Sequence, residues 1–71
     1  MTVLVRYLAK SGNAKWAYVE HRDGRYSDGT KETAFQSAIK RLRLYPEEYQ
    51  AWAIIRLSDM RILAQSKGYT P

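Results

Sequence analysis

Residues 30–44, TKETAFQSAIKRLRL, constrain the fold most, because this is the only segment whose apolar residues recur at helical spacing. That spacing places them along one side of a helix with 3.6 residues per turn. The residues concerned are Ala34, Phe35, Ala38, Ile39 and Leu42. Segments typical of β-strands precede and follow this stretch. The simplest way to bury the apolar side of the helix is therefore to pack it on a sheet built from the rest of the chain.

The sequence also indicates where this helix begins and ends. Thr30 is the favoured N-cap and Asp28 the competing one, because both side chains can accept a hydrogen bond from a free backbone N–H group. Pro46 marks the end of the helix, since the residue in front of a proline, here Tyr45, is pushed away from helical geometry.

Five segments around the helix are rich in β-branched and aromatic residues, which favours strands. The predicted strands are residues 2–9, 15–22, 25–27, 51–58 and 61–66. Residues 10–13 form a turn cluster, and Asp23 with Gly24 is typical of a two-residue hairpin loop. We therefore predict a single α+β domain over residues 1–71, in which one helix packs on one face of an antiparallel sheet of four to five strands. The predicted order is strand, strand, short strand, helix, strand, strand, with residues 67–71 as a loose tail.

Charge and cysteine content narrow the classes of partner. Lys and Arg number 12 against 7 Asp and Glu, which gives a net charge of +5. Such a charge favours polyanions, with nucleic acid first and acidic protein surfaces second. It can also simply keep a small protein dissolved, and that alternative stays open. Because the chain has no cysteine, disulfides cannot reinforce its thin core, and self-association into a homodimer is a further expectation.

The sequence lacks the usual signals of catalysis and of membrane insertion. His21 is the only histidine, and strand alternation places its neighbour Glu20 on the opposite face. No phosphate loop, nucleophile elbow or HExxH motif occurs, and the zinc ligands are too few. We therefore expect a non-enzyme without cofactor or metal. No apolar run approaches the ~20 residues of a membrane span, and a signal-peptide pattern is missing, so we expect a cytoplasmic protein without a membrane partner.

Basic and aromatic residues are the candidates for a binding surface, since cations bind phosphates and aromatic rings stack on bases. The predicted binding residues are Lys15, Trp16, Arg22, Arg25, Tyr26, Lys40, Arg41 and Arg43. One predicted group consists of Lys15, Arg22 and Arg25 around the Asp23-Gly24 hairpin, and these cations can alternatively belong to an ordinary solvated loop. The helix cations Lys40, Arg41 and Arg43 can alternatively serve only to cover the apolar edge and stabilise the helix end. Tyr45 and Tyr49 form an alternative ridge for docking a protein.

Residues 32–68, ETAFQSAIKRLRLYPEEYQAWAIIRLSDMRILAQSKG, resemble the helix-then-hairpin ending of small phage and mobile-element proteins, including some anti-CRISPR proteins. In those proteins a short sheet with one helix blocks a larger nucleic-acid-handling complex. The first half, with its Asp23-Gly24-Arg25 hairpin, resembles the arm-type DNA-binding domain of tyrosine integrases, although this chain adds two strands after its helix.

The combined expectation is a small, basic, non-catalytic binding protein of phage or mobile-element origin. We expect it to act on nucleic acid or on a nucleic-acid-handling host complex. The alternative is an anti-CRISPR-like or host-takeover inhibitor that binds only protein and makes no nucleic-acid contact of its own.

Overall fold

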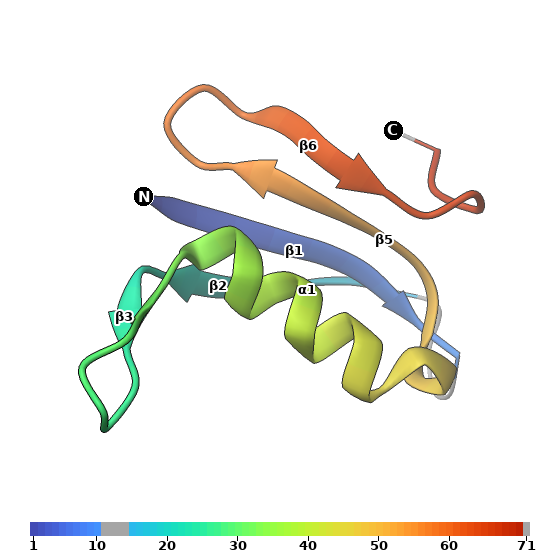
Figure 1. Cartoon of the computed structure of the whole chain (residues 1–71). Helices are drawn as coiled ribbons and strands as arrows, with labels where there is room; N and C mark the ends of the chain where they lie inside the picture. Colours follow the sequence, from blue (N-terminus) through green and yellow to red (C-terminus); the bar gives the residue numbers. More distant parts are fainter. Residues whose placement is uncertain (11–14, 71) are drawn as a thin grey trace.

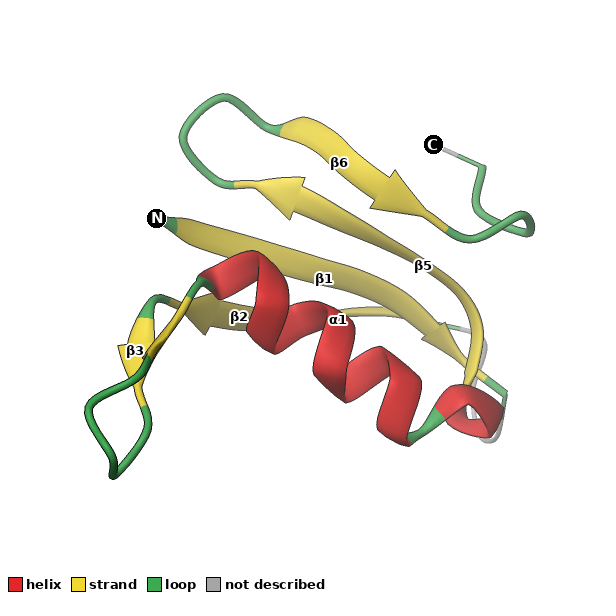
Figure 2. Cartoon of the chain, viewed as in Figure 1, coloured by secondary structure: helices red, strands yellow, loops and turns green. Residues whose placement is uncertain are grey.

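The computed structural model describes residues 1–10 and 15–70 and shows one helix packed on an antiparallel sheet (Figures 1 and 2). The sheet has four strands in the order β2-β1-β5-β6. These strands are β1 (Thr2–Ala9), β2 (Trp16–Arg22), β5 (Tyr49–Arg56) and β6 (Arg61–Gln65). The helix α1 (Ala34–Leu44) crosses one face of the sheet, and a short 3₁₀ turn, η1 (Pro46–Glu48), leads from it to β5. The predicted α+β architecture is confirmed.

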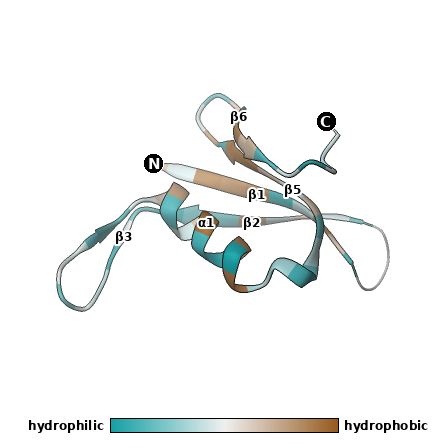
Figure 3. Ribbon diagram, turned by 45° about the vertical axis from the view of Figure 1, so that its right-hand side comes forward, coloured by the Kyte–Doolittle hydropathy of each residue, from teal (hydrophilic) through white to brown (hydrophobic). Residues whose placement is uncertain are grey.

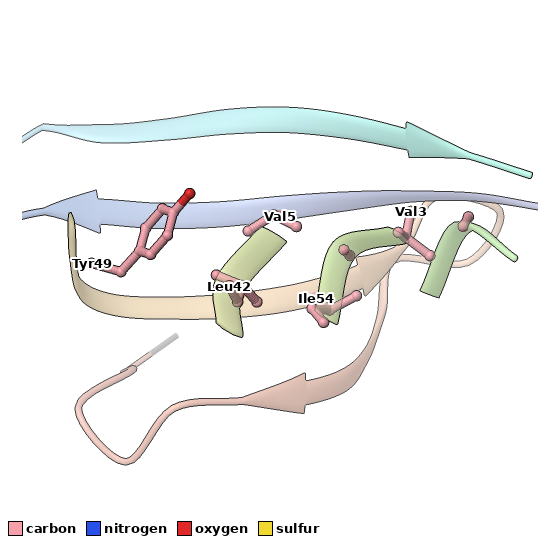
Figure 4. Packing of buried hydrophobic residues seen from close by; sticks show 7 residues of the cluster. Val3, Val5, Leu42, Tyr49 and Ile54 are labelled. Atoms are coloured by element: carbon pink, nitrogen blue, oxygen red, sulfur yellow. The ribbon is translucent and has the colours of Figure 1, made fainter. Parts of the chain in front are cut away.

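Strand β1 lies at the centre of the sheet, and its alternating residues separate the two faces. Val3 and Val5 pack in one core cluster with the buried side of α1, whereas the intervening strand positions point to the opposite face. Figure 3 shows apolar stretches on the central strands β1 and β5. Ile54 of β5 is opposite Val5 and, like Val3, is completely buried (Figure 4).

The side of α1 that faces the sheet is built from small residues at its centre. Ala34 and Ala38 are fully buried and Leu42 is 7% exposed. Two alanines one turn apart let the helix approach the strands closely. Phe35 and Ile39 are only half-buried, because they lie on a flank of the helix and not on its sheet-facing side. The predicted burial of the apolar side is therefore confirmed for Ala34, Ala38 and Leu42. Phe35 and Ile39 are more exposed than predicted.

The helix begins later than predicted, and neither Thr30 nor Asp28 is its N-cap. Thr33 caps the helix: its Oγ1 accepts a hydrogen bond from the Gln36 N–H at 3.1 Å, and the Gln36 Oε1 accepts one from the Thr33 N–H at 3.0 Å. This reciprocal capping box satisfies two backbone N–H donors. Thr30 as N-cap would satisfy only one, because the residue three positions later is Thr33 and not a glutamate or glutamine. Thr30 instead donates its backbone N–H to Asp28 within a loop.

The predicted reversal at Asp23 and Gly24 is also wrong. The chain continues into β3 (Gly24–Arg25), which pairs with β4 (Lys31–Glu32) as a separate two-stranded sheet, so the predicted third strand at residues 25–27 is shorter and begins earlier. The reversal occurs between these two strands, where Gly29 adopts a φ of +86°. This β3–β4 hairpin extends away from the main sheet beside the start of α1 (Figures 1 and 3).

The side chain of Asp23 explains why the Asp-Gly pair does not form a turn. One carboxylate oxygen accepts the Ala34 N–H at the start of α1 at 2.7 Å, and the other accepts the Met1 amino group at 2.6 Å. Both bonds lower the pKa of Asp23, the bond from the amino group most. Asp23 therefore joins the start of β1, the end of β2 and the helix N-terminus.

The predicted loose tail is wrong for its described part. Tyr69 is 5% exposed and packs edge-on against the Trp16 ring, with 5.4 Å between the centroids. Its hydroxyl accepts a hydrogen bond from the Arg6 guanidinium at 2.9 Å. The described part of the C-terminal segment is held in place because the Tyr69 side chain packs on the sheet face opposite α1. Pro71, and residues 11–13 of the predicted first turn, lie outside the described residues.

Replacing Tyr69 tests whether this segment contributes to stability. Tyr69→Ala should lower the free energy of unfolding by about 3 kcal/mol, because it removes a buried ring and the acceptor of Arg6. The exposed neighbour substitution Thr70→Ala should change it by less than about 0.5 kcal/mol. Urea denaturation measures both. Equal effects of the two substitutions would show that the segment is not anchored.

His21 lies between β2 and α1 and is held there as a neutral ring. Its Nδ1 shares a hydrogen bond with the Ser37 hydroxyl at 2.9 Å, and its buried Nε2 has no partner among the described residues. The protonated ring carries a hydrogen on both nitrogens, so its buried Nε2–H would have no acceptor among the described residues. Burial lowers the pKa of His21 below 6.5, the charge of Arg41 lowers it further, and the charge of Glu32 opposes both.

Stability should consequently fall as the pH drops below about 6.5. In that range His21 of the unfolded chain binds a proton more readily than His21 of the folded chain, whose pKa is lower. We expect the melting temperature to be lower at about pH 5.5 than at about pH 7.5. The non-titrating variant His21→Gln should lose most of this difference. A wild-type melting temperature that stays constant or rises on acidification would contradict the prediction.

Candidate nucleic-acid interface

A groove with a volume of about 590 Å³ runs between α1 and the β3–β4 hairpin. The apolar part of its lining, which we call the floor, consists of the half-buried Phe35 and Ile39 together with Leu44, which is 60% exposed. Lys31 of the hairpin lines one side, and Lys40 and Arg43 of the helix line the other. The hairpin leaves the main sheet beside the helix (Figure 3), and residues of both elements line the groove.

Tyr26 lies at the hairpin side of this groove and is held in place by several contacts. Its backbone N–H donates to the Thr30 carbonyl at 2.8 Å, which closes the hairpin loop. Its hydroxyl donates to the Glu32 carboxylate, and the Lys40 ammonium lies 5.1 Å from the ring centroid. The bond to Glu32 raises the pKa of Tyr26, so the phenol stays neutral near pH 7. Tyr26 as a whole is nevertheless 44% exposed.

Four cations line the groove or lie next to it. Among the described residues, Arg25, Lys31, Lys40 and Arg43 form no ion pair. Arg25 and Lys31 are directly opposite each other in the β3–β4 pair, an arrangement of like charges that is unfavourable in a sheet. Glu32 also lines the groove, but its carboxylate accepts the Tyr26 hydroxyl. A polyanion bound along the hairpin and helix would relieve this repulsion.

The structure thus brings together four of the predicted binding residues, namely Arg25, Tyr26, Lys40 and Arg43. Arg25 lies on the hairpin itself, next to the groove, and the other three line it. The sequence prediction missed Lys31 and Leu44. The Ser27-Asp28-Gly29 turn residues could have indicated a hairpin that places Lys31 opposite Arg25.

Arg41 and the two tyrosines after the helix lie elsewhere. The Arg41 Nε donates to the Tyr49 hydroxyl at 3.2 Å, and its guanidinium lies 5.8 Å from the Tyr45 ring centroid. Tyr49 is only 9% exposed and packs edge-on against Tyr7 at 5.2 Å. The predicted docking ridge is therefore wrong for Tyr49, because its ring fills the core, and only Tyr45 remains accessible.

The remaining predicted residues are separated from the groove. Strand alternation places Trp16 and Arg22 on the sheet face opposite α1, and Lys15 precedes Trp16 as an exposed residue. The Trp16 ring is half-buried beneath the guanidinium of Arg6, which lies 4.4 Å from its centroid. Arg22 is paired with Glu20 at 3.1 Å. The predicted cluster of Lys15, Arg22 and Arg25 around one hairpin is therefore not formed.

Two further features of the described chain bear on the site. Within residues 1–10 and 15–70, no three His, Asp or Glu side chains gather where a metal ion could be held. In the same part of the chain, α1 is too short and too polar to cross a lipid bilayer, and no other helix meets that requirement. Comparisons of the chain with protein-family models, with curated proteins and with solved structures found no match.

Proposed function

We propose that this protein is a non-catalytic nucleic-acid-binding domain whose contact surface is the groove between α1 and the β3–β4 hairpin. The observation that carries the proposal is the gathering of Arg25, Lys31, Lys40 and Arg43 around one exposed groove without carboxylate partners among the described residues. The excess of 12 Lys and Arg over 7 Asp and Glu adds a long-range attraction for polyanions.

The chemistry of these side chains suits phosphate groups. Lysine ammonium groups act as compact point charges, and an arginine guanidinium can bind two phosphate oxygens at once. Each phosphate that is neutralised releases condensed counterions, so affinity must fall as salt rises. Such contacts position a nucleic acid without reading its sequence.

The salt dependence of binding tests this proposal. If all four cations contact phosphates, log affinity against log salt should have a slope of about −3.6 for duplex DNA and about −2.8 for a single strand. Fluorescence anisotropy with labelled oligonucleotides between about 50 and about 200 mM salt gives this slope. Lys40→Gln should make it shallower by about 0.7 to 0.9, because one phosphate contact is lost.

A matched control is Lys67→Gln, which removes an exposed cation from the C-terminal segment, outside the groove. It should leave the slope unchanged. Absence of nucleic-acid binding, or equal changes of slope in Lys40→Gln and Lys67→Gln, would contradict the proposal. Absence of binding would leave a purely protein-binding inhibitor as the remaining interpretation.

A further inference from the structure

We infer that the preferred ligand is a single-stranded nucleic acid, one base of which enters the groove and stacks on Tyr26. The inference rests on the proposed function and adds the class of nucleic acid. It covers DNA and RNA strands alike, because the base face and the phosphates that carry the argument are common to both.

The apolar floor favours an unpaired base over a duplex. Phe35, Ile39 and Leu44 offer apolar surface in the middle of a charged rim. A duplex keeps the faces of its bases stacked inside and presents phosphates, sugars and base edges, so it offers no flat base face to the apolar floor. An unpaired base has an apolar face that every sequence shares. The groove volume of about 590 Å³ falls within the range of sites that enclose small ligands, so a base fits.

Tyr26 is already ordered for stacking. Its hydroxyl is held by Glu32, its backbone closes the hairpin loop, and the Lys40 ammonium lies over the ring at 5.1 Å. Because these contacts fix the ring before a ligand arrives, little conformational entropy is lost on binding. Tyr26 is 44% exposed, and the Lys40 ammonium lies over one face of its ring. A base therefore stacks on the opposite face, or takes the place of that ammonium as Lys40 turns to a phosphate.

The rim cations are placed for the backbone on both sides of an inserted base. Lys31 lies on the hairpin side, and Lys40 and Arg43 lie on the helix side. A strand that crosses the groove can therefore place a base on the floor while its flanking phosphates meet cations on both sides. This combination of a basic groove and an aromatic ring is the arrangement used by single-strand-binding proteins.

The test compares oligonucleotides of about twelve thymidines or uridines with a duplex of equal length, again by fluorescence anisotropy. The protein variants are Tyr26→Leu, which removes the ring, and Tyr26→Phe, which keeps it. We expect tighter binding to at least one single strand than to the duplex. Tyr26→Leu should weaken single-strand binding by about five- to a hundredfold. Tyr26→Phe should weaken it clearly less, because it keeps the stacking ring and loses only the bond to Glu32. The salt slope should stay the same, since no phosphate contact is removed.

Leu44→Ala keeps the test decisive if Tyr26→Leu disturbs the hairpin, because Leu44 is an exposed helix residue outside that hairpin. It should weaken single-strand binding and leave duplex binding unchanged. A duplex bound as tightly as both single strands, with the expected salt slope, would overturn the inference and leave the proposed function standing. Equal affinities of Tyr26→Leu and Tyr26→Phe would also overturn it. Failure of all oligonucleotides to bind would overturn both and point to a protein ligand.

Discussion

The structure depends on the close packing of one short helix against a four-stranded sheet. Ala34 and Ala38 have no exposed surface, so the helix axis can approach β1 closely, and Val3, Val5 and Ile54 fill the space beneath it. Each buried aliphatic side chain of the size of valine or isoleucine contributes about 1.5–3 kcal/mol. In a chain of 71 residues the core is thin, and these few contacts carry a large share of the stability.

The same packing determines which surface remains for binding. The His21–Ser37 and Arg41–Tyr49 hydrogen bonds join the helix to β2 and β5. Phe35 and Ile39 lie outside the buried row and become the floor of the groove beside the hairpin. On the opposite sheet face, the Tyr69 ring covers Trp16. The groove thus contains apolar surface that the helix leaves exposed. Among the described residues, no carboxylate forms an ion pair with the cations that border it.

Local sequence patterns predicted the helix and the strands. Contacts between residues distant in sequence determined the turn after β2, the C-terminal segment and the surface on which each candidate residue lies. The residue pattern of the first strand predicted the bounds that β1 has in the structure. Pro46 predicted the end of α1 at Leu44. Asp23 misled the prediction because its carboxylate binds backbone groups of distant residues instead of closing a turn. Tyr69 was similarly misjudged, since its partner Arg6 is 63 positions away. Tyr26, Lys40 and Arg43 line one groove, whereas Trp16 and Arg22 lie on the opposite sheet face. Local patterns do not give this grouping, because it depends on where the β3–β4 hairpin leaves the sheet.

The central claim is that nucleic acid binds the groove between α1 and the hairpin and not the opposite sheet face. The most direct measurement is a ¹H–¹⁵N NMR titration of the protein with a single-stranded oligonucleotide. The account predicts chemical-shift changes concentrated at residues 25–32 and 35–44, with the amide signals of Trp16, Tyr18 and Tyr69 nearly unchanged. Changes concentrated at those three aromatic residues, with the groove signals unaffected, would contradict it.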